Sequence, residues 1–429
     1  MFGFANFLLL ALFAAAVFDL IFALARGGGL RGALHGLWNT PHLLFGQQLA
    51  EWRLQLGRIL FAAGLAAYEI SVVFCNSMAR QNWAWVQGVM SPVLEWLAFL
   101  CFGAKILFGT RYTWRELLAG GALYFIARWV YFNSQNIWWI GIVVAVLAAK
   151  DVPLRRPLQV YFASGCAAMA VVLALHFAGI VAPDLTSERM GALRGTYGYG
   201  HPNTFGGLVF GLVLAYALLR AQKVRWVDCL LVFAVGVFLL VGPASRSAAL
   251  CTLALAVGLV FCRLRAGHSV PRWWPGTCAG MVGLTAAVSY LLPLLVIKVG
   301  PWNNDIGPAW LAKLDSLLTC RISLTWMAYR LLDVKIAGQV FNWPTVDNSF
   351  AFALFQFGPV VAALLGILFA AALWGHAKQG RRVEVCCLSA MLAYAYMEVQ
   401  PFHLTTNPTA LLLCGAVFAQ TSARWQKIE

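Results

Sequence analysis

One glycine-rich stretch of this chain gathers three side chains that could bind or activate a charged substrate. It reads RMGALRGTYGYGHPNTFGG over residues 189–207 and contains Arg189, Arg194 and His201. Arginine donates paired hydrogen bonds to phosphate oxygens, and histidine is the commonest general base in enzymes. Pro202 favours the start of a helix, whose first N–H groups also attract anions. The stretch predicts an anion site, although a turn with Arg194 against lipid headgroups fits its spacing equally well.

Polar residues at the edges of three apolar runs are further candidates. Arg246 stands between two serines in GPASRSAAL, where either an anion contact or a snorkelling arginine is expected. Asp347 and Asn348 precede an apolar run in VDNSF, where Asp347 is expected either to cap the helix or to act as a catalytic or acceptor-binding carboxylate. Glu398 lies inside an apolar run, and a carboxylate at membrane depth is functional by default. Asn203 is expected to help satisfy the free N–H groups at the start of its helix.

A long polar segment, residues 298–347, carries Arg321 and Arg330 among several tryptophans. Aromatic faces and arginines together bind sugars and phosphates. The same mixture is typical of a helix at a membrane interface. Residues 322–332, ISLTWMAYRLL, are apolar on most faces and predict such a helix, because the run is too short to span a bilayer.

Composition identifies the elements that must position these residues as membrane helices. The chain has 429 residues, of which 61% are hydrophobic and 11% charged, and its mean hydropathy is +0.76. Soluble domains are about 25% charged, so a soluble fold is excluded. We expect an all-α polytopic membrane protein with about 12–13 transmembrane helices in one integral membrane domain, residues 1–429. The expected spans are 2–25, 58–78, 91–109, 115–132, 137–150, 158–182, 203–220, 226–243, 246–262, 275–297, 348–374, 383–400 and 408–421.

The basic residues give this bundle an orientation. Of the 31 Lys and Arg residues, 21 fall in every second connection, which the positive-inside rule places in the cytoplasm together with the C-terminus. The substantial outer loops are then 183–202 and 298–347, the latter between the tenth and eleventh spans. The remaining ten cations oppose the insertion signal, and an anionic ligand on the outer face is the simplest reason for them. They are Arg80, Arg128, Arg189, Arg194, Arg246, Lys298, Lys313, Arg321, Arg330 and Lys335.

The sequence lacks the motifs that are typical of several other functional classes. The net charge of +15 belongs to membrane loops, so we expect no nucleic-acid partner. No nucleotide-binding glycine motif is present, which disfavours an ATP-driven transporter. The eleven cysteines show no spacing typical of zinc ligands and are interpreted as small apolar core residues. We therefore expect neither a metal nor a cofactor.

Five motifs in this order resemble the bacterial O-antigen ligase and polymerase superfamily, and most closely the Wzy-type polymerases of capsule and exopolysaccharide loci. They are GTYGYGHPNTFGG before a span, SRSAAL after the next span, TCRISLTWMAYRLLD in the large outer loop, VDNSF entering a span, and Glu398 followed by NP before the last span. The resemblance covers roughly residues 50–420. Each motif is short, and their order and topological side make the match specific.

The resemblance implies a GT-C-like helical bundle in the bacterial cytoplasmic membrane. It also implies transfer of a glycan from undecaprenyl pyrophosphate to an acceptor sugar at the outer face, without a metal. Arg194, Arg246 and Arg321 would hold the pyrophosphate, with Arg189 beside them. His201 or Asp347 would orient or deprotonate the acceptor hydroxyl, and the choice between these two is open. Asn203, Asn348 and Glu398 would support the site.

The resemblance leaves alternatives open. A ligase of the same superfamily would transfer the glycan to lipid A core, whereas GHPNTFG together with VDNSF favours the polymerase, for which a flippase and a chain-length regulator are expected partners. A transporter of lipid-linked glycans is the alternative from another class. It predicts broken helices and charges around a cavity at the membrane midplane, whereas the cations here gather at one mouth.

Overall fold

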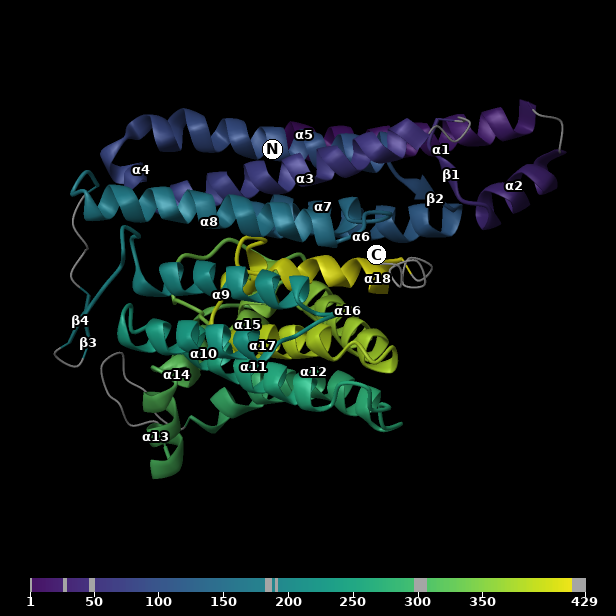
Figure 1. Cartoon of the computed structure of the whole chain (residues 1–429). Coiled ribbons are helices and arrows are strands. Elements are labelled where there is room, and N and C mark those ends of the chain that lie inside the picture. Colours follow the sequence, from purple (N-terminus) through teal and green to yellow (C-terminus); the bar gives the residue numbers. More distant parts are fainter. Residues whose placement is uncertain are drawn as a thin grey trace. The chain divides into compact units, whose positions relative to one another are not determined.

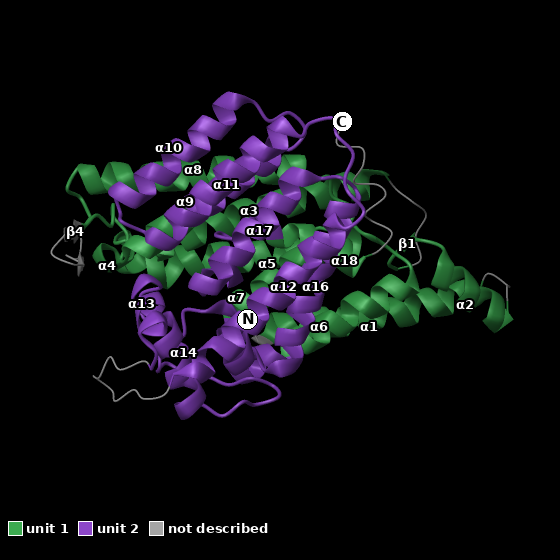
Figure 2. Ribbon diagram, turned by 90° about the horizontal axis from the view of Figure 1, so that it is seen from below, with its two compact units in different colours: residues 1–128, 137–208, 410–429 green, residues 129–136, 209–409 purple. Residues whose placement is uncertain are grey.

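The structure is a computed structural model that describes residues 2–25, 29–45, 51–181, 187–189, 192–296 and 307–418. Helices make up most of this part of the chain (Figure 1). Two compact units are present (Figure 2). Unit 1 comprises Met1–Arg128, Ile137–Leu208 and Ala410–Glu429, and unit 2 comprises Trp129–Asn136 and Val209–Thr409.

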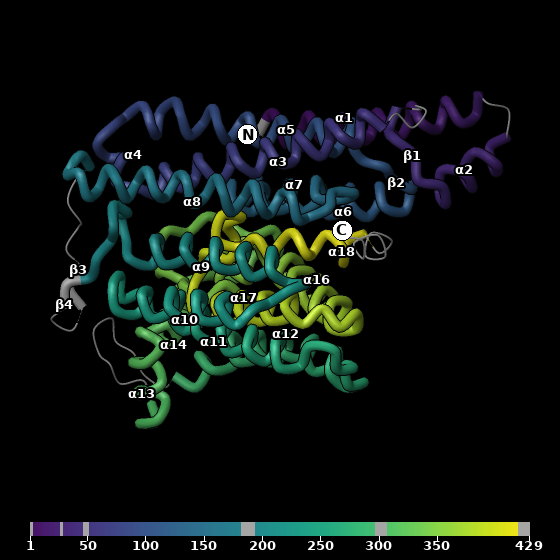
Figure 3. Tube along the Cα trace, in the orientation of Figure 1, coloured from purple at the N-terminus to yellow at the C-terminus, as the bar shows by residue number. Residues whose placement is uncertain are grey.

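Unit 1 is built around long helices that run side by side. Helices α3, α5 and α8 form its centre (Figure 3). Gly57 of α3 lies directly against Gly109, where a Cβ on Gly57 would be 2.8 Å from the Gly109 Cα, so glycine permits this close approach. The helices of this unit are α1 (Phe2–Ala25), α2 (Gly29–Asn39), α3 (Glu51–Cys75), α4 (Ala79–Asn82), η1 (Val86–Met90), α5 (Ser91–Phe108), α7 (Ile137–Ala148), α8 (Arg155–Phe177) and α18 (Cys414–Val417).

Three helices belong partly to each unit, and short strands tie the loops of unit 1. Helix α6 (Trp114–Ser134), helix α9 (Pro202–Leu219) and the 3₁₀ helix η5 (Pro408–Leu413) have residues in both units. Strand β1 (His42–Leu43) pairs antiparallel with β2 (Arg111–Tyr112), with His42 opposite Tyr112. Strand β3 (Ser187–Arg189) pairs with β4 (Ala192–Arg194), with Arg189 opposite Ala192.

Unit 2 contains the remaining helices, in which α10 packs on α11, α11 on α17, and α12 on α16. Its elements are α10 (Trp226–Val241), α11 (Arg246–Leu264), α12 (Trp274–Leu291), η2 (Leu292–Leu295), α13 (Ala309–Leu317), α14 (Arg321–Leu331), α15 (Ser349–Phe352), η3 (Ala353–Phe357), α16 (Pro359–Lys378), α17 (Arg382–Met397) and η4 (Gln400–Phe402). Helix α14 confirms the helix predicted over 322–332. Residues 298–306 of the predicted outer loop lie outside the described residues, as do 183–186, 190 and 191.

The expectation of an all-α membrane protein is confirmed at the level of helix length and composition. Eight described helices are long and apolar enough to cross a membrane, and three shorter apolar helices accompany them. Large apolar side chains on α1 face outward, including Phe13, which is 71% exposed, as expected for contact with lipid. The eight are Gly3–Ala25, Glu51–Cys75, Val86–Phe108, Arg155–Phe177, Pro202–Leu219, Arg246–Leu264, Trp274–Leu295 and Pro359–Lys378, and the shorter ones are Ile137–Ala148, Trp226–Val241 and Pro408–Val417.

The predicted span 348–374 is wrong as a single helix, because the chain breaks at Gly358. This residue has φ 88° and ψ 164°, a conformation open only to glycine, and Pro359 then starts α16. The backbone of Ile336 fills the break, since a Cβ on Gly358 would lie 2.1 Å from the Ile336 carbonyl oxygen. Gln339 also donates its backbone N–H to the carbonyl of Gln356 at 3.2 Å. The loop after α14 is therefore locked onto the broken helix.

The last predicted span, 408–421, is not a regular α-helix in the described residues. Residues 408–413 form the 3₁₀ helix η5, only four α-helical residues follow in α18, and 419–421 lie outside the described residues. Asn407 donates to the Pro401 carbonyl at 2.9 Å, and Thr409 donates to the Asn407 side chain at 2.5 Å. The Asn407 side chain thus satisfies a backbone carbonyl of the irregular segment, as a buried polar group requires.

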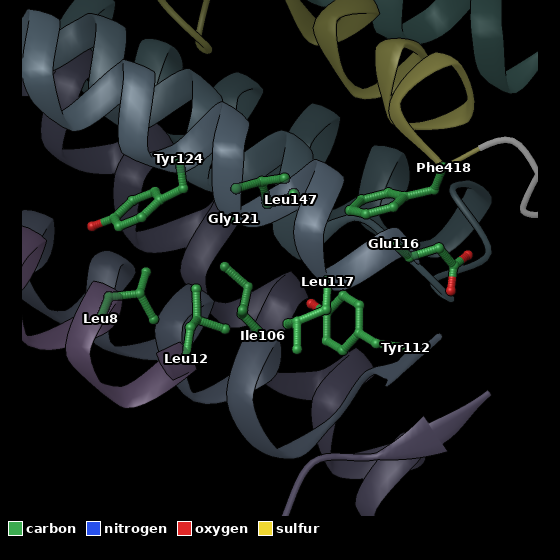
Figure 4. Close-up of a pocket in the computed structure, with 11 residues that line it drawn as sticks. Leu8, Leu12, Ile106, Tyr112, Glu116, Leu117, Gly121, Tyr124, Leu147 and Phe418 are labelled. Carbon is green, nitrogen blue, oxygen red and sulfur yellow. The ribbon is translucent and has the colours of Figure 1, made fainter. Parts of the chain in front are cut away.

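A small apolar cavity in unit 1 lies between α1, α5, α6 and α7 (Figure 4). Leu8, Leu12, Ile106 and Leu147 line it, and its volume is about 10 Å³. That volume holds about one water molecule at most. The cavity is therefore a packing defect and too small for a sugar or a lipid.

Candidate functional site

Arg321 and Glu398 form a buried ion pair in unit 2. The Arg321 Nη2 lies 2.5 Å from Oε1 of Glu398, and the two residues are 7% and 4% exposed. Ser247 joins the pair, since its hydroxyl donates to the same carboxylate oxygen at 2.9 Å and accepts from the Arg321 Nη2 at 3.3 Å. The pair therefore connects the start of α14, the end of α17 and the first turn of α11.

Arg321 makes five hydrogen bonds, as many as its guanidinium has N–H donors. Besides those to Glu398 and Ser247, Nη1 donates to the Leu318 carbonyl at 2.9 Å and to the Thr319 hydroxyl at 2.6 Å, and Nε donates to the Met397 carbonyl. A guanidinium satisfied in this way is fixed in one orientation. In this arrangement Arg321 organises the surrounding chain ends rather than presenting donors to a ligand.

Asp315 of α13 fixes the turn that delivers Arg321. Its carboxylate is fully buried and accepts from the backbone N–H of Ile322 at 2.7 Å and of Ser323 at 3.2 Å, so it caps α14 from outside the helix. Thr319 and Cys320 both adopt positive φ, 61° and 64°, which turns the chain sharply before α14. Two strained residues in succession persist because the Asp315 cap holds the turn.

Asp347, Asn348 and Ser349 lie next to Glu398. The Ser349 hydroxyl donates to the Glu398 carbonyl at 2.6 Å. The Asn348 side chain accepts from the N–H groups of Phe350 and Ala351 and thus caps α15, and it donates to the Ser289 hydroxyl at 3.0 Å. Asp347 is half-buried and interacts electrostatically with Glu398. The cap predicted at Asp347 is wrong by one residue, because Asn348 caps α15, while Asp347 adds a second carboxylate to the cluster.

Arg246 is exposed at the first residue of α11, directly before Ser247. Its neighbour in sequence is thus part of the Arg321–Glu398 cluster, whereas its own side chain faces outward. An exposed guanidinium is accessible to a charged ligand and can donate paired hydrogen bonds to it, so Arg246 suits such a contact better than the buried Arg321.

His403, in the chain that follows Glu398, contributes no charge. Burial lowers the pKa of its imidazole to about 3, so the ring is neutral at physiological pH. The Thr406 hydroxyl donates to its carbonyl at 3.1 Å. His403 is therefore part of the satisfied irregular segment before η5.

In unit 1, Arg194 and Asn203 form a second polar contact. The buried Arg194 ends β4 and donates from Nη2 to the Asn203 Oδ1 at 3.0 Å, which connects the strand to the first turn of α9. The loop between them is attached to the turn between α3 and α4, because Met78 donates its N–H to the Gly198 carbonyl at 2.8 Å and Ser77 bridges to Tyr199. Residues 195–201 are therefore held in place, with the buried Arg194 directly before them.

His201 caps α9. Its Nδ1 accepts from the backbone N–H of Asn203 at 3.1 Å, and the residue is exposed. Because Nδ1 is an acceptor, the proton of the neutral ring is on Nε2. Nε2 is then a donor, which suits His201 to orienting a sugar or phosphate oxygen better than to removing a proton. For Arg189 the structure describes only the backbone, in β3.

The structure also contains a buried ionic cluster that the sequence analysis missed. In unit 1 the Lys150 ammonium lies 3.2 Å from Glu116 and 3.5 Å from Asp151, and Lys105 donates to the Thr110 hydroxyl at 2.7 Å. These residues close the turns before α6 and α8. Lys105 and Lys150 belong to the basic residues that the positive-inside rule assigns to cytoplasmic loops. Nothing in the sequence indicates that Lys150 pairs with Glu116 and Asp151.

The predicted site residues therefore form two sets, each inside one unit. Unit 2 brings together Arg321, Glu398, Asn348 and Asp347, with Arg246 next to Ser247 in sequence, and unit 1 brings together Arg194, Asn203 and His201. No group of three His, Cys, Asp or Glu residues within the described ranges is arranged to hold a metal ion. No protein-family model matches this chain, and no curated protein or solved structure shows significant similarity to it.

Proposed function

We propose that this protein is a membrane glycosyltransferase that polymerises oligosaccharide repeat units carried on undecaprenyl pyrophosphate. The observation that carries the proposal is the buried Arg321–Glu398–Ser247 cluster, because it joins three of the motifs on which the family resemblance rests. These motifs are up to 151 residues apart in the sequence. Residues so far apart in the sequence form one hydrogen-bonded group either in a structural core or in a functional site. The exposed Arg246 and the half-buried Asp347 near this cluster favour a functional site.

In the proposed reaction the hydroxyl of an acceptor sugar attacks the anomeric carbon of the donor glycan. A C–O bond forms to the acceptor oxygen, the C–O bond to the pyrophosphate breaks, and undecaprenyl pyrophosphate leaves with the bonding electrons. The hydroxyl proton passes to a carboxylate, for which we propose Asp347 because it is less buried than Glu398. Arg246 stabilises the charge that builds on the leaving oxygen.

The other residues support these two. Arg321 binds the Glu398 carboxylate and holds the ends of α14 and α17, and Asn348 fixes the backbone next to Asp347. We assign Arg194 and Asn203 of unit 1 to phosphate and sugar oxygens, with His201 as a hydrogen-bond donor from Nε2. We also propose that Arg189 contacts phosphate, because it lies in the same glycine-rich stretch as Arg194.

Complementation tests this proposal in cells that lack the native gene. Variants Arg246→Ala and Asp347→Asn are expected to lose long polymer and to accumulate single lipid-linked repeats, because both act on the bond that is made or broken. Arg330→Ala is the matched control, since this exposed arginine of the same predicted outer loop stacks on Trp326 at 5.8 Å. Normal chain length in both site variants at wild-type protein abundance contradicts the proposal.

A ligase would use the same residues with a different acceptor. Purified protein, one lipid-linked repeat and lipid A core in the same reaction distinguish the two enzymes, because the polymerase extends the repeat and the ligase glycosylates the core. We expect only the former product.

A transporter of lipid-linked glycans is a second candidate, favoured by the helix break at Gly358. Transporters of several folds bind substrate where helices are interrupted. Here the backbone at Lys335 and Ile336 occupies the break, which leaves the interrupted helix without an open carbonyl end at that point. Translocation of a fluorescent lipid-linked glycan in liposomes, with no new glycosidic bond, would favour the transporter.

A further inference from the structure

Two cysteine side chains of unit 2 meet where helix α11 packs on helix α17, and the proposed reaction uses neither of them. The Sγ atoms of Cys262 and Cys386 lie 3.5 Å apart. The two residues are 124 positions apart in the sequence and share no spacing motif. Their meeting is therefore a product of the helix packing, and the interpretation of every cysteine as a small apolar core residue does not account for it.

Gly258 of α11 brings the Cys386 sulfur directly against α11. A Cβ on Gly258 would lie 3.1 Å from the Cys386 Sγ and 3.3 Å from its Cβ, so the absence of a side chain at this position permits the approach. Cys262 lies four residues after Gly258 and thus one turn further along the same face of the helix. The Cys386 sulfur therefore faces the side of α11 that carries the Cys262 thiol.

The pair lies near the polar ends of both helices. Exposed Arg263 directly follows Cys262, which is itself 7% exposed, whereas Cys386 is partly exposed. Arg382, one turn before Cys386, donates to the Arg265 carbonyl at 2.6 Å and holds the start of α17 against the chain that leaves α11. Both helix ends are thus fixed, and Cys386 is the more accessible of the two thiols.

The geometry suits a covalent bond between the two sulfurs. An S–S bond is about 2.05 Å long, so the sulfur atoms need to approach by about 1.5 Å, a movement within reach of side-chain rotation. At their opposite ends the same two helices are already connected, because Ser247 donates to Glu398 at 2.9 Å. A disulfide between Cys262 and Cys386 would therefore fasten α11 to α17 at both ends.

We propose that Cys262 and Cys386 are a modification site at which a hydroperoxide forms a reversible disulfide. The Cys386 thiolate attacks a peroxide oxygen, the O–O bond breaks, and Cys386 sulfenic acid and one water result. The Cys262 sulfur then attacks the sulfenic sulfur, the S–S bond forms, the S–O bond breaks, and a second water leaves. The two thiols lose two electrons and two protons in total, and the peroxide takes up both.

The positive-inside rule places Arg263 and Arg382 in the cytoplasm, and the cysteine pair lies at that end of the helices. Cellular reductants there keep thiols reduced, so such a disulfide lasts only while oxidant is present. This modification does not depend on the proposed glycosyltransferase activity.

Peptide mass spectrometry of the purified full-length protein tests the proposal. The protein is treated with hydrogen peroxide and unfolded, and the remaining thiols are blocked with N-ethylmaleimide. We expect most of Cys262 and Cys386 in one cross-linked peptide, and we expect a thiol reductant added before unfolding to restore both thiols. Cys262→Ser should leave Cys386 as a sulfenic acid that dimedone traps, and Cys386→Ser should leave Cys262 as a thiol.

The matched control is Cys387→Ser, which removes the neighbouring thiol, a fully buried group on a different face of α17. It is expected to leave the yield of the Cys262–Cys386 peptide unchanged. Absence of this peptide from the oxidised wild type overturns the proposal, as does an equal loss of cross-linking in the Cys387 and Cys262 variants. A cross-link that the reductant opens only after unfolding is a permanent structural bridge and also overturns it.

Discussion

Replacing Arg321 by methionine tests whether the Arg321–Glu398 pair organises unit 2. Methionine keeps an apolar stem of similar reach and removes all five donors. Glu398 is 4% exposed and would lose its countercharge. Removing one partner of a buried ion pair costs about 3–5 kcal/mol, so we expect the free energy of unfolding to fall by roughly that amount.

A double-mutant cycle separates this electrostatic effect from lost packing. Glu398→Gln keeps the shape of the side chain and an acceptor for Ser247, and we expect it to cost about 1.5–3 kcal/mol. The double variant contains no uncompensated charge. Its cost should therefore fall short of the sum of the single costs by about 2 kcal/mol or more.

The assay is unfolding of purified protein in mixed micelles of increasing SDS fraction, followed by far-ultraviolet circular dichroism. Arg330→Met is the control, because Arg330 is exposed on the same helix and contacts Trp326. Additive costs in the cycle would refute the reasoning, as would an Arg321 variant no less stable than the Arg330 variant.

Three further predictions concern the residues that position the site. Asp315→Ala should cost about 1–2 kcal/mol by loss of the α14 cap and should lower turnover, and wild-type turnover in a folded sample would show that the cap does not position Arg321. Gly358→Ala should prevent accumulation of folded protein, as measured by gel filtration. Gly366→Ala, where the added Cβ meets no other atom, should not. Equal yields of folded protein from the two variants would contradict the packing at the break. His201→Asn, which can still cap α9, should retain most polymerisation in the complementation assay, and a loss as complete as in Asp347→Asn would assign His201 as the base.

Hydropathy predicted the class of fold but not where helices break. The run that enters at VDNSF is apolar throughout, so a window average treats Gly358 as one more small residue. The break depends on a positive φ and on the Ile336 backbone beside it, and neither is encoded in hydropathy. The segment before Cys414 is apolar as well, and hydropathy does not distinguish its 3₁₀ backbone from an α-helix.

Charge in an apolar context identified Glu398, and resemblance identified Arg321, but their pairing could not be predicted. The two residues are 77 positions apart, and Arg128, Arg246 and Arg330 were equally eligible partners on the predicted outer side. Asp315 escaped notice because its carboxylate reaches α14 only through a turn of two left-handed residues, and Thr319 and Cys320 give no turn signal. Pairing of this kind is a property of the tertiary fold.

The most direct test of the proposed function is a reaction of the purified protein with a single synthetic undecaprenyl-pyrophosphate-linked repeat unit in detergent, without nucleotide. Products are resolved by gel electrophoresis and mass spectrometry. We predict lipid-linked chains of two or more repeats, with one undecaprenyl pyrophosphate released for each bond formed, and no such products from Asp347→Asn. Unchanged substrate with the folded wild-type protein would contradict the account. So would products from Asp347→Asn and Arg246→Ala in the same yield as from the wild type.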